Sequence, residues 1–253
     1  MDKNIYWLLR DKYNYTKNQI DNFNINSASL NIRQDIEKLA NGEPINYVIG
    51  WQEFLDCKID LSYKPLIPRV ETEFWVKNVI DNIKITNNNI SVLDLCCGSG
   101  CIGIAVLKHI SNSFVTFSDI SDNAIAQTKL NLNINNINPK RYLVTKSDLF
   151  KNINTKFDFI FANPPYVDKN GFVPDSLKFE PEIAIFASDN GMKIIKKILE
   201  QFDNYLKVSG QLFMEFGYKQ DKEIKEILIN SNKVNFNILK DQYNVDRVLH
   251  YRF

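Results

Sequence analysis

Histidine and cysteine are scarce in this chain, and their positions argue against a metal centre or a disulfide framework. The sequence holds 253 residues, of which two are histidines, His109 and His250, and four are cysteines. Three of the cysteines, Cys96, Cys97 and Cys101, crowd into one short stretch, which is a poor layout for disulfides. Neither histidine stands at metal-ligand spacing from them, so we expect no metal site.

Long apolar runs and an excess charge of one sign are also missing. Charged residues interrupt the N-terminal stretch every few positions, so it contains no apolar core of a signal peptide. No window approaches the roughly 20 apolar residues that span a bilayer. Lys plus Arg number 31 against 30 Asp plus Glu, which provides no broad attraction to nucleic acid or an anionic membrane. We expect a cytoplasmic protein without membrane or stable nucleic-acid binding.

The chain is long enough for a mid-sized domain and a small additional one. Residues 1–45 predict the small one, a helical domain. Thr16 and Gln19 have the spacing of a capping box, in which each side chain satisfies a free backbone amide. Gly42 suits a left-handed helix cap, and Pro44 prevents the helix from continuing.

Residues 46–71 predict a linker that contains a β-hairpin. Residues 47–61 are rich in aromatic and aliphatic side chains on both sides of a short polar interruption at residues 56–58. Two apolar runs separated by a short polar turn are typical of two paired antiparallel strands. We therefore expect a hairpin that bridges the two domains.

Residues 72–253 alternate strand and helix patterns, which predicts an α/β domain with a mostly parallel sheet covered on both faces. Val76, Val79, Ile80 and Ile83 form the apolar stripe of one helix. The expected strands are residues 92–95, 114–118, 142–146, 157–162 and 211–215, with an antiparallel pair near 234–239 and 247–252. That makes about seven strands. The Asn-rich stretches 86–90 and 131–138 are expected to be loops.

A glycine-containing turn follows the first expected strand. Residues 96–100 are Cys96, Cys97, Gly98, Ser99 and Gly100, and a helix is expected from about residue 101. Glycine suits a tight turn that approaches a ligand, and a helix start offers free amides to an anionic group. These five residues are candidates for cofactor binding. Because residues 98–103 also match G-x-G-x-x-G, a dinucleotide-binding fold and a turn without a ligand remain alternatives.

Acidic residues follow the next two expected strands. Asp119 is placed beside the ligand crevice of an open sheet, where a carboxylate accepts hydrogen bonds from ribose hydroxyls. Its alternative role is to cap the following helix, although Ser121 could do so instead. Asp148 could bind an adenine amino group and Leu149 could pack on the ring. Without the other motifs, Asp148 would be an ordinary loop acid.

The strongest motif is Asn-Pro-Pro-Tyr at residues 163–166, directly after an apolar strand. Pro164 and Pro165 remove two backbone donors and lock the local dihedral angles, which leaves the Pro164 carbonyl free and rigidly aimed. Asn163 adds a second acceptor, its side-chain oxygen. Two fixed acceptors suit both hydrogens of a planar NH2 group, and Tyr166 offers a flat face beside it. A rigid turn without function is the alternative. The pattern predicts catalytic roles for Asn163, Pro164 and Tyr166, and substrate contacts for all four residues.

Together these motifs resemble those of class I S-adenosylmethionine methyltransferases. More closely, the chain resembles the HemK/PrmC family, the release-factor glutamine N5-methyltransferases, over almost its whole length. Residues 42–50 with Phe54 are similar to the family's interdomain hairpin, and residues 66–73 match its I-P-R-x-E/D-T-E signature. Later blocks resemble it at residues 179–184, 215–218 and 246–248. The resemblance implies a Rossmann-like catalytic sheet whose last strand is antiparallel, and a helical N-terminal domain that holds a protein substrate.

The resemblance also implies roles for individual residues. It places residues 96–100 around the methionine part of S-adenosylmethionine, Asp119 on its ribose, and Asp148 with Leu149 near adenine. It places residues 163–166 on a glutamine amide, with Asn163 also beside the cofactor. Three departures are Cys96, where the family often has glycine, Val70, which replaces a common proline, and Leu149, where an aromatic residue is common.

The expected activity is methyl transfer from S-adenosylmethionine to the side-chain amide nitrogen (N5) of the glutamine in the Gly-Gly-Gln motif of peptide chain release factors. The expected enzyme is a monomer. The nearest alternative is a nucleic-acid methyltransferase acting on adenine N6 or guanine N2, because the same motif grips any planar amino group. A dinucleotide oxidoreductase leaves residues 163–166 unexplained, and a binding protein without catalysis is the non-enzyme alternative.

Overall fold

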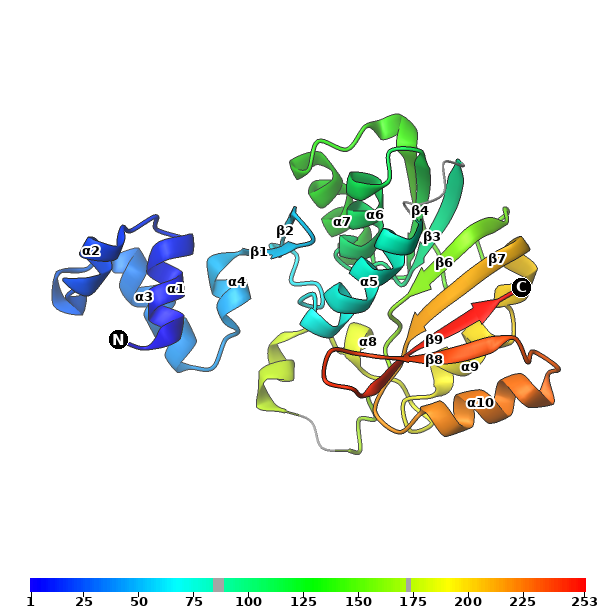
Figure 1. The fold of residues 1–253 in the computed structure, drawn as a ribbon. Coiled ribbons are helices and arrows are strands. Elements are labelled where there is room, and N and C mark those ends of the chain that lie inside the picture. The colour runs from blue at the N-terminus through cyan, green and yellow to red at the C-terminus, as the bar shows by residue number, and fades with distance from the viewer. Residues whose placement is uncertain (84–88, 172–173) are drawn as a thin grey trace.

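A group of short N-terminal helices and a larger part built round a twisted sheet make up the structure, a computed structural model (Figure 1). A small two-stranded ribbon lies between the two parts. The structure describes residues 1–83, 89–171 and 174–253. Most of the Asn-rich stretch 86–90 lies outside these residues, but Ile90 already belongs to a strand, so the expected loop ends before it.

The N-terminal helices pack on a small core of their own, except that Tyr47 of the last one belongs to a core cluster of the sheet part. They are α1 (Lys3–Asp11), α2 (Lys17–Asp21), a 3-10 turn η1 (Ile25–Ser27), α3 (Leu30–Ala40) and α4 (Ile45–Ile49). Leu9, Ile20 and Ile32 form the buried centre. Two expected details are confirmed: Thr16 and Gln19 form the capping box, and the residue after the α3 cap, Gly42, is left-handed with φ 84°.

The ribbon is an antiparallel hairpin of β1 (Trp51–Phe54) and β2 (Cys57–Asp60). Leu55 and Asp56 form its turn with φ values of 47° and 61°, because hairpins of two-residue loops need left-handed residues to match the strand twist. The hairpin is confirmed, but its expected limits were wrong. Residues 47–49 are helical in α4, and Cys57 is a fully buried strand residue rather than part of the polar turn.

Within the described residues the larger part contains a seven-stranded mixed sheet, which confirms the expected α/β class. Its strands are β3 (Ile90–Leu95), β4 (Ser113–Asp119), β5 (Tyr142–Lys146), β6 (Phe157–Ala162), β7 (Leu206–Glu215), β8 (Phe236–Lys240) and β9 (Asp246–Arg252). They lie in the order β5-β4-β3-β6-β7-β9-β8, and only β9 pairs antiparallel, with β7 and β8. The last strand is therefore antiparallel, as expected. It lies inside the sheet, where four of its successive residues are buried, and β8 lies half-exposed at the edge.

Helices cover both faces of the sheet (Figure 1). On one face lie α5 (Val70–Ile83), α6 (Cys101–His109) and α7 (Asp122–Ile134), and on the other α9 (Lys193–Leu199) and α10 (Asp221–Asn230). Successive strand residues point to opposite faces, so Val92 joins the first core and Leu93 the second. The apolar stripe predicted for α5 is confirmed, because all four of its residues are buried.

Short elements complete the chain. They are α8 (Glu182–Ile185) and the 3-10 turns η2 (Pro139–Arg141), η3 (Asp175–Phe179) and η4 (Phe202–Tyr205). The loop predicted at residues 131–138 was wrong for residues 131–134, which continue α7. The reason is that Asn131 is fully buried and uses its amide to hold other segments, so its polarity did not indicate exposure.

The strand order reverses between β3 and β6. From β3 the chain moves outward through β4 to β5, and then returns to β6 on the other side of β3. In an open parallel sheet, ligands bind at the carboxyl ends of the strands where the order reverses. The predicted site residues after β3, β4, β5 and β6 therefore meet at one edge.

Candidate active site

The turn after β3 is shaped by three left-handed residues. Cys96, Gly98 and Gly100 have φ values of 58°, 54° and 77°. A Cβ atom added at Gly98 would meet nothing within 4 Å, so the backbone there faces open space. At Gly100 a Cβ atom would lie 2.9 Å from the Thr128 Cγ2 atom, so this position is closed against α7. The turn thus presents its backbone to a ligand on one side and packs on the other.

Two side chains of α7 hold this turn from behind. The Thr128 hydroxyl donates to the Gly98 carbonyl at 3.2 Å, and the Asn131 amide donates to the Ser99 carbonyl at 2.9 Å. Both side chains are fully buried. Because the carbonyls are held toward α7, the turn keeps a fixed shape. We did not predict either residue from the sequence, where Asn131 was assigned to a loop.

Asp119 is tied to the same turn. One carboxylate oxygen accepts from the Gly98 amide and the other from the Ser121 amide, each at 2.9 Å. Burial raises the pKa of Asp119, and the amides of Ser121 and Gly98 act in the opposite direction. The N-cap of α7 is Ser121, not Asp119. The carboxylate therefore lies beside the turn without serving as the helix cap.

The thiols of Cys96 and Cys97 stay protonated in this site. Burial raises the pKa of each well above the ordinary value, and the nearby acid Asp119 adds to the effect. The thiolate is the nucleophilic form of cysteine. These side chains therefore form part of the wall and do not act as nucleophiles.

A cavity of about 750 Å³ opens at this edge of the sheet. It brings together most of the predicted residues, which are Cys96, Cys97, Gly98, Ser99, Asp119, Asp148, Leu149, Asn163 and Pro165. Three others are not among the residues that line it: Gly100 is the N-cap of α6, Pro164 is buried between Asn163 and Pro165, which both line the cavity, and Tyr166 turns its hydroxyl toward Glu215. A pocket of this size is typical of sites for cofactors and small ligands.

Asn163 is held through its nitrogen. Its Nδ2 atom donates to the Thr72 hydroxyl oxygen at 3.2 Å, and that hydroxyl donates its own hydrogen to Glu215 Oε2 at 2.7 Å. A hydroxyl has one hydrogen to donate, so Thr72 accepts from Asn163. The Asn163 carbonyl oxygen therefore faces away from Thr72. Across the described part of the chain, no donor contacts this oxygen or the carbonyl oxygen of Pro164.

Glu215, at the end of β7, is hydrogen-bonded to α5 and to the segment after β6. It accepts from Thr72, from the indole of Trp75 at 2.8 Å and from the hydroxyl of Tyr166 at 2.9 Å. Burial raises the pKa of Glu215 and also raises that of Tyr166, so the phenol remains a donor. The sequence placed Thr72 and Glu215 in stretches that resemble a family, but predicted no role for them or for Trp75.

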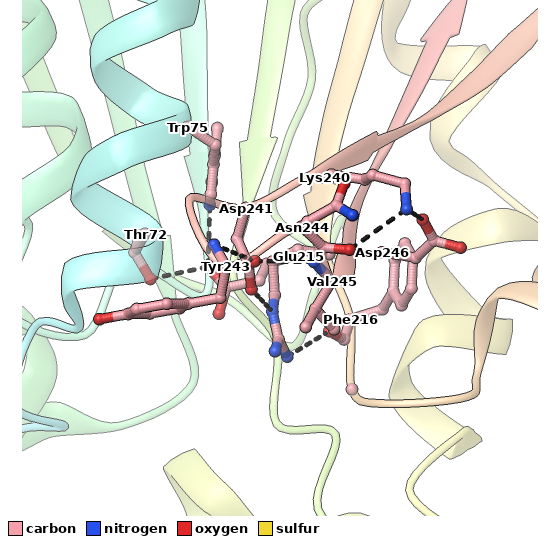
Figure 2. A network of polar contacts seen from close by, with 12 residues as sticks. Thr72, Trp75, Glu215, Phe216, Lys240, Asp241, Tyr243, Asn244, Val245 and Asp246 are labelled. Carbon is pink, nitrogen blue, oxygen red and sulfur yellow. Dashed lines mark hydrogen bonds and ion pairs between the residues drawn. The ribbon is translucent and has the colours of Figure 1, made fainter.

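The β8–β9 turn lies next to this cluster. Figure 2 shows Thr72 and Trp75 pointing toward Glu215, with Asp241 and its turn nearby. Arg247 donates to Asp241 at 3.2 Å and to the Phe216 carbonyl at 3.3 Å. Its positive charge lowers the pKa of Glu215 and so offsets part of the burial effect. The cluster thus places a cation near its buried carboxylate.

The cavity fits the expected cofactor on structural grounds. The open backbone at Gly98 admits a close approach, and the Asp119 carboxylate lies beside it to accept from hydroxyl groups. Leu149, with φ 49°, adds an apolar contact. In residues 1–83, 89–171 and 174–253, no cluster of His, Cys, Asp and Glu could hold a metal. None of the helices described there is long and apolar enough to cross a membrane.

Residues 72–177 match the family model described as methyltransferase small domain. The fold is that of a class I methyltransferase. Among solved structures, the catalytic domain of hMettl16 in complex with MAT2A 3'UTR hairpin 6 has a TM-score of 0.63 and 18% identity, covering 98% of this chain and 90% of that one. At this identity the likeness shows the fold alone.

The release factor glutamine methyltransferase of Lactococcus lactis is 35% identical to this chain over 208 residues, covering 80% of this chain and 75% of the relative. The one from Streptococcus pneumoniae is 34% identical over 220 residues, covering 84% of this chain and 76% of the relative. This chain therefore belongs to the release factor glutamine methyltransferase family. The dinucleotide-binding alternative is therefore wrong. Gly103 of its motif instead allows α6 to pack on β4, because a Cβ atom there would lie 2.3 Å from Phe117.

Proposed function

We propose that this chain transfers a methyl group from S-adenosylmethionine to the side-chain amide nitrogen (N5) of the glutamine in the Gly-Gly-Gln motif of peptide chain release factors. The observation that carries the proposal is the orientation of the Asn163 amide, whose oxygen is left for a substrate donor while Thr72 holds its nitrogen. Family membership supports the choice of a release factor.

In the proposed complex, the Asn163 oxygen and the Pro164 carbonyl accept the two hydrogens of the substrate NH2 group. The cofactor supplies an electrophilic methyl group on a sulfonium sulfur. An amide nitrogen is a weak nucleophile, because its lone pair is delocalised into the carbonyl, so the chain contributes mainly orientation. Well-aligned reactants gain up to roughly 7–11 kcal/mol. The two acceptors also stabilise the positive charge that develops on the nitrogen.

No histidine is needed as a base in this scheme, because the surplus proton leaves to water after transfer. The two histidines have other contacts: His109 lies against the Leu55 carbonyl, and His250 against Gln211, each at 2.8 Å. Burial lowers the pKa of His250 to about 4, so it is neutral at physiological pH. Neither lines the cavity.

We base the proposed cofactor roles on the residues that line the cavity. Residues 96–100 surround the methionine part, Asp119 accepts from the ribose hydroxyls, and Asp148 and Leu149 lie near adenine. In support of these roles, residues 96–99, Asp119, Asp148 and Leu149 line the same cavity as Asn163. Tyr166 is proposed to offer the flat face of its ring to the substrate amide, while its hydroxyl is held by Glu215.

The same proposal covers the partner and its location. Residues 1–45 would hold the release factor, residues 46–71 would connect them to the catalytic domain, and residues 72–253 would carry the reaction. The enzyme would act as a monomer in the cytoplasm, where release factors act, without stable binding to nucleic acid. The balanced charge, 31 Lys plus Arg against 30 Asp plus Glu, supports a protein substrate.

Replacing Asn163 tests the amide grip. Asn163→Ala removes one of the two acceptors, and we expect kcat for release factor methylation to fall by about 10²-fold, as for the loss of one oriented transition-state contact. Asn230→Ala, at the exposed end of α10, is the matched control. The measurement is the steady-state rate of labelled-methyl transfer with both substrates saturating. An undiminished rate in Asn163→Ala would disprove the role.

The substrate class is tested separately, with the wild-type enzyme. Labelled S-adenosylmethionine is incubated with release factors, RNA and DNA, and the label is located by peptide and nucleoside mapping. We expect label on the glutamine of the Gly-Gly-Gln loop. Label only on adenine or guanine would overturn the proposed substrate and favour the nucleic-acid alternative.

A further inference from the structure

The buried carboxylate of Glu215 is linked to Asn163 through Thr72 but does not line the cavity. Glu215 is 1% exposed and does not line the cavity. Its three partners come from two elements that are far apart in sequence: Thr72 and Trp75 from α5, and Tyr166 from the segment after β6. Each partner presents a donor hydrogen. Glu215 therefore fixes the directions of the Thr72 and Tyr166 hydroxyl hydrogens.

The direction of the Thr72 hydroxyl decides the direction of the Asn163 amide. Because the Thr72 hydrogen points to Glu215, the oxygen has only lone pairs for Asn163. An amide turned the other way would place its carbonyl oxygen against those lone pairs, with no hydrogen between them. The relay from Glu215 through Thr72 thus selects one of two amide orientations of nearly equal shape.

The two orientations suit different substrates. With its oxygen toward the cavity, Asn163 accepts from the NH2 group of a glutamine side chain. With its nitrogen toward the cavity, it would instead donate, which suits a carbonyl or carboxylate oxygen and opposes an NH2 group. A mispaired polar group in a site built for hydrogen bonding is strongly rejected. The amide orientation therefore bears on which side chains the site admits.

We propose that Thr72 is a positioning and specificity residue, which under the direction of Glu215 holds the Asn163 amide with its acceptor toward the substrate NH2. The inference rests on the proposed function and extends it to residues outside the Asn-Pro-Pro-Tyr motif. The surrounding packing favours a fixed relay. Trp75 lies edge-on against Phe161 of β6, with ring centroids 6.0 Å apart, so the Glu215 donors on α5 are locked against the strand that leads to Asn163.

The test compares two substitutions at one position. Thr72→Val keeps the shape and removes the hydroxyl, which releases the Asn163 amide to turn. Thr72→Ser keeps the hydroxyl and removes a methyl group. We expect Thr72→Val to lower kcat for release factor methylation by about 10-fold or more, as expected for losing alignment, while Thr72→Ser retains most of the wild-type kcat. The dissociation constant for S-adenosylmethionine, measured by calorimetry, should change little in either variant.

A double-substitution cycle separates positioning from a general structural role. If Thr72 acts through Asn163, Thr72→Val causes little further loss of kcat in an Asn163→Ala background, because contacting residues with one shared role are not additive. Equal fractional losses in both backgrounds would overturn the proposal. Thr116→Val, at a buried β4 threonine outside the cavity, is the matched control and should retain wild-type kcat.

The two Thr72 variants can also contradict the inference by themselves. Wild-type kcat in Thr72→Val, or a Thr72→Ser variant as impaired as Thr72→Val, would also overturn the inference. If Thr72→Val fails to fold, judged by its thermal midpoint, Thr72→Cys replaces it, since a thiol is only a weak hydrogen-bond donor and acceptor. We then expect a kcat between those of Thr72→Ser and Asn163→Ala. A wild-type enzyme that leaves release factors unmethylated would instead refute the proposed function.

Discussion

At the scale of single residues, the turn after β3 contains a residue in an unfavourable backbone conformation. Cys96 is left-handed with φ 58°, a conformation that costs a residue with a Cβ atom about 1–2 kcal/mol. This is the position where the resembling family often has glycine. The backbone keeps the left-handed shape here despite the side chain, because the Cys97 amide bonds the Ser118 carbonyl at 3.0 Å and the Gly98 amide bonds Asp119.

Asp94, two residues earlier, is a buried acid with an unsatisfied oxygen. One carboxylate oxygen accepts from the Gly103 amide at 2.9 Å, while the other, Oδ1, is buried with no partner in the described structure. Burial raises the pKa of Asp94 to about 8, and the Gly103 amide opposes the shift. An acid buried in this way is held protonated at neutral pH.

The Asp94 shift predicts a pH dependence of stability. Its pKa is higher in the folded than in the unfolded chain, so between these values the folded state binds more protons and stability falls as pH rises. The slope is at most about 1.4 kcal/mol per pH unit. We expect the free energy of unfolding to fall more steeply with pH, from about pH 5.5 to 7.5, in the wild type than in Asp94→Asn. Urea titrations measure this difference, and parallel curves would contradict the assignment.

At the scale of elements, α7 connects the turn after β3 to the hairpin. Asn131 donates to the Ser99 carbonyl and accepts from the Asp60 amide at 2.8 Å. One turn later, Asn135 pairs with the backbone of Lys58, through contacts of 3.0 and 2.8 Å. The helix thus uses its amide side chains to bind β2 at one side and the turn at the other. The hairpin is thereby anchored to the turn after β3.

Removing the Asn131 side chain should therefore weaken cofactor binding from behind the wall. Asn131→Ala leaves the Ser99 carbonyl and the Asp60 amide without partners, a loss of about 1–3 kcal/mol in stability. We expect the dissociation constant for S-adenosylmethionine to rise by about 5- to 10-fold, since the turn loses its fixed shape.

Calorimetry of cofactor binding measures this effect. Asn133→Ala, on the exposed face of the same helix, is the control and should bind as the wild type does. Equal affinities in Asn131→Ala and Asn133→Ala would show that the turn is rigid without α7.

At the scale of the whole molecule, the chain has two kinds of core. The N-terminal helices pack round Leu9, Ile20 and Ile32, and the two large clusters on the faces of the sheet include none of these residues. The segment between them is fastened to the sheet part: buried Glu180 accepts from the Ile67 amide at 2.9 Å and from Arg69 at 2.6 Å. The helical group therefore stands on an anchored linker (Figure 1).

Deleting residues 1–41 should separate substrate docking from chemistry. Because the sheet part keeps its own cores, we expect cofactor affinity to be retained. We expect kcat/KM for an intact release factor to fall by about 10-fold or more, a loss of about 1.4 kcal/mol in docking, and less for a short Gly-Gly-Gln peptide. Parallel assays with both substrates measure the ratio. Equal losses for the two would argue against a docking role for the helices.

Particular residues show which parts of the fold the sequence predicts. Periodicity located α5 and most strands, because apolar side chains must face a core wherever they occur in the chain. It failed at Asn131 and Cys57, because burial of a polar or small residue depends on partners far away in sequence. Most of the predicted motif residues after β3 to β6 line one cavity, because strand ends in an open sheet meet at one edge.

The amino-acid sequence by itself determined the α/β pattern, the backbone stiffness of Pro164 and Pro165, and the left-handed positions at Gly98 and Gly100, since these depend on local sterics and spacing. Only the tertiary structure decided which way the Asn163 amide faces, because that depends on Thr72 and Glu215, which are 91 and 52 positions away. Hydrogen-bond direction is a property of the partners a fold brings together, and it has no local signature in the chain.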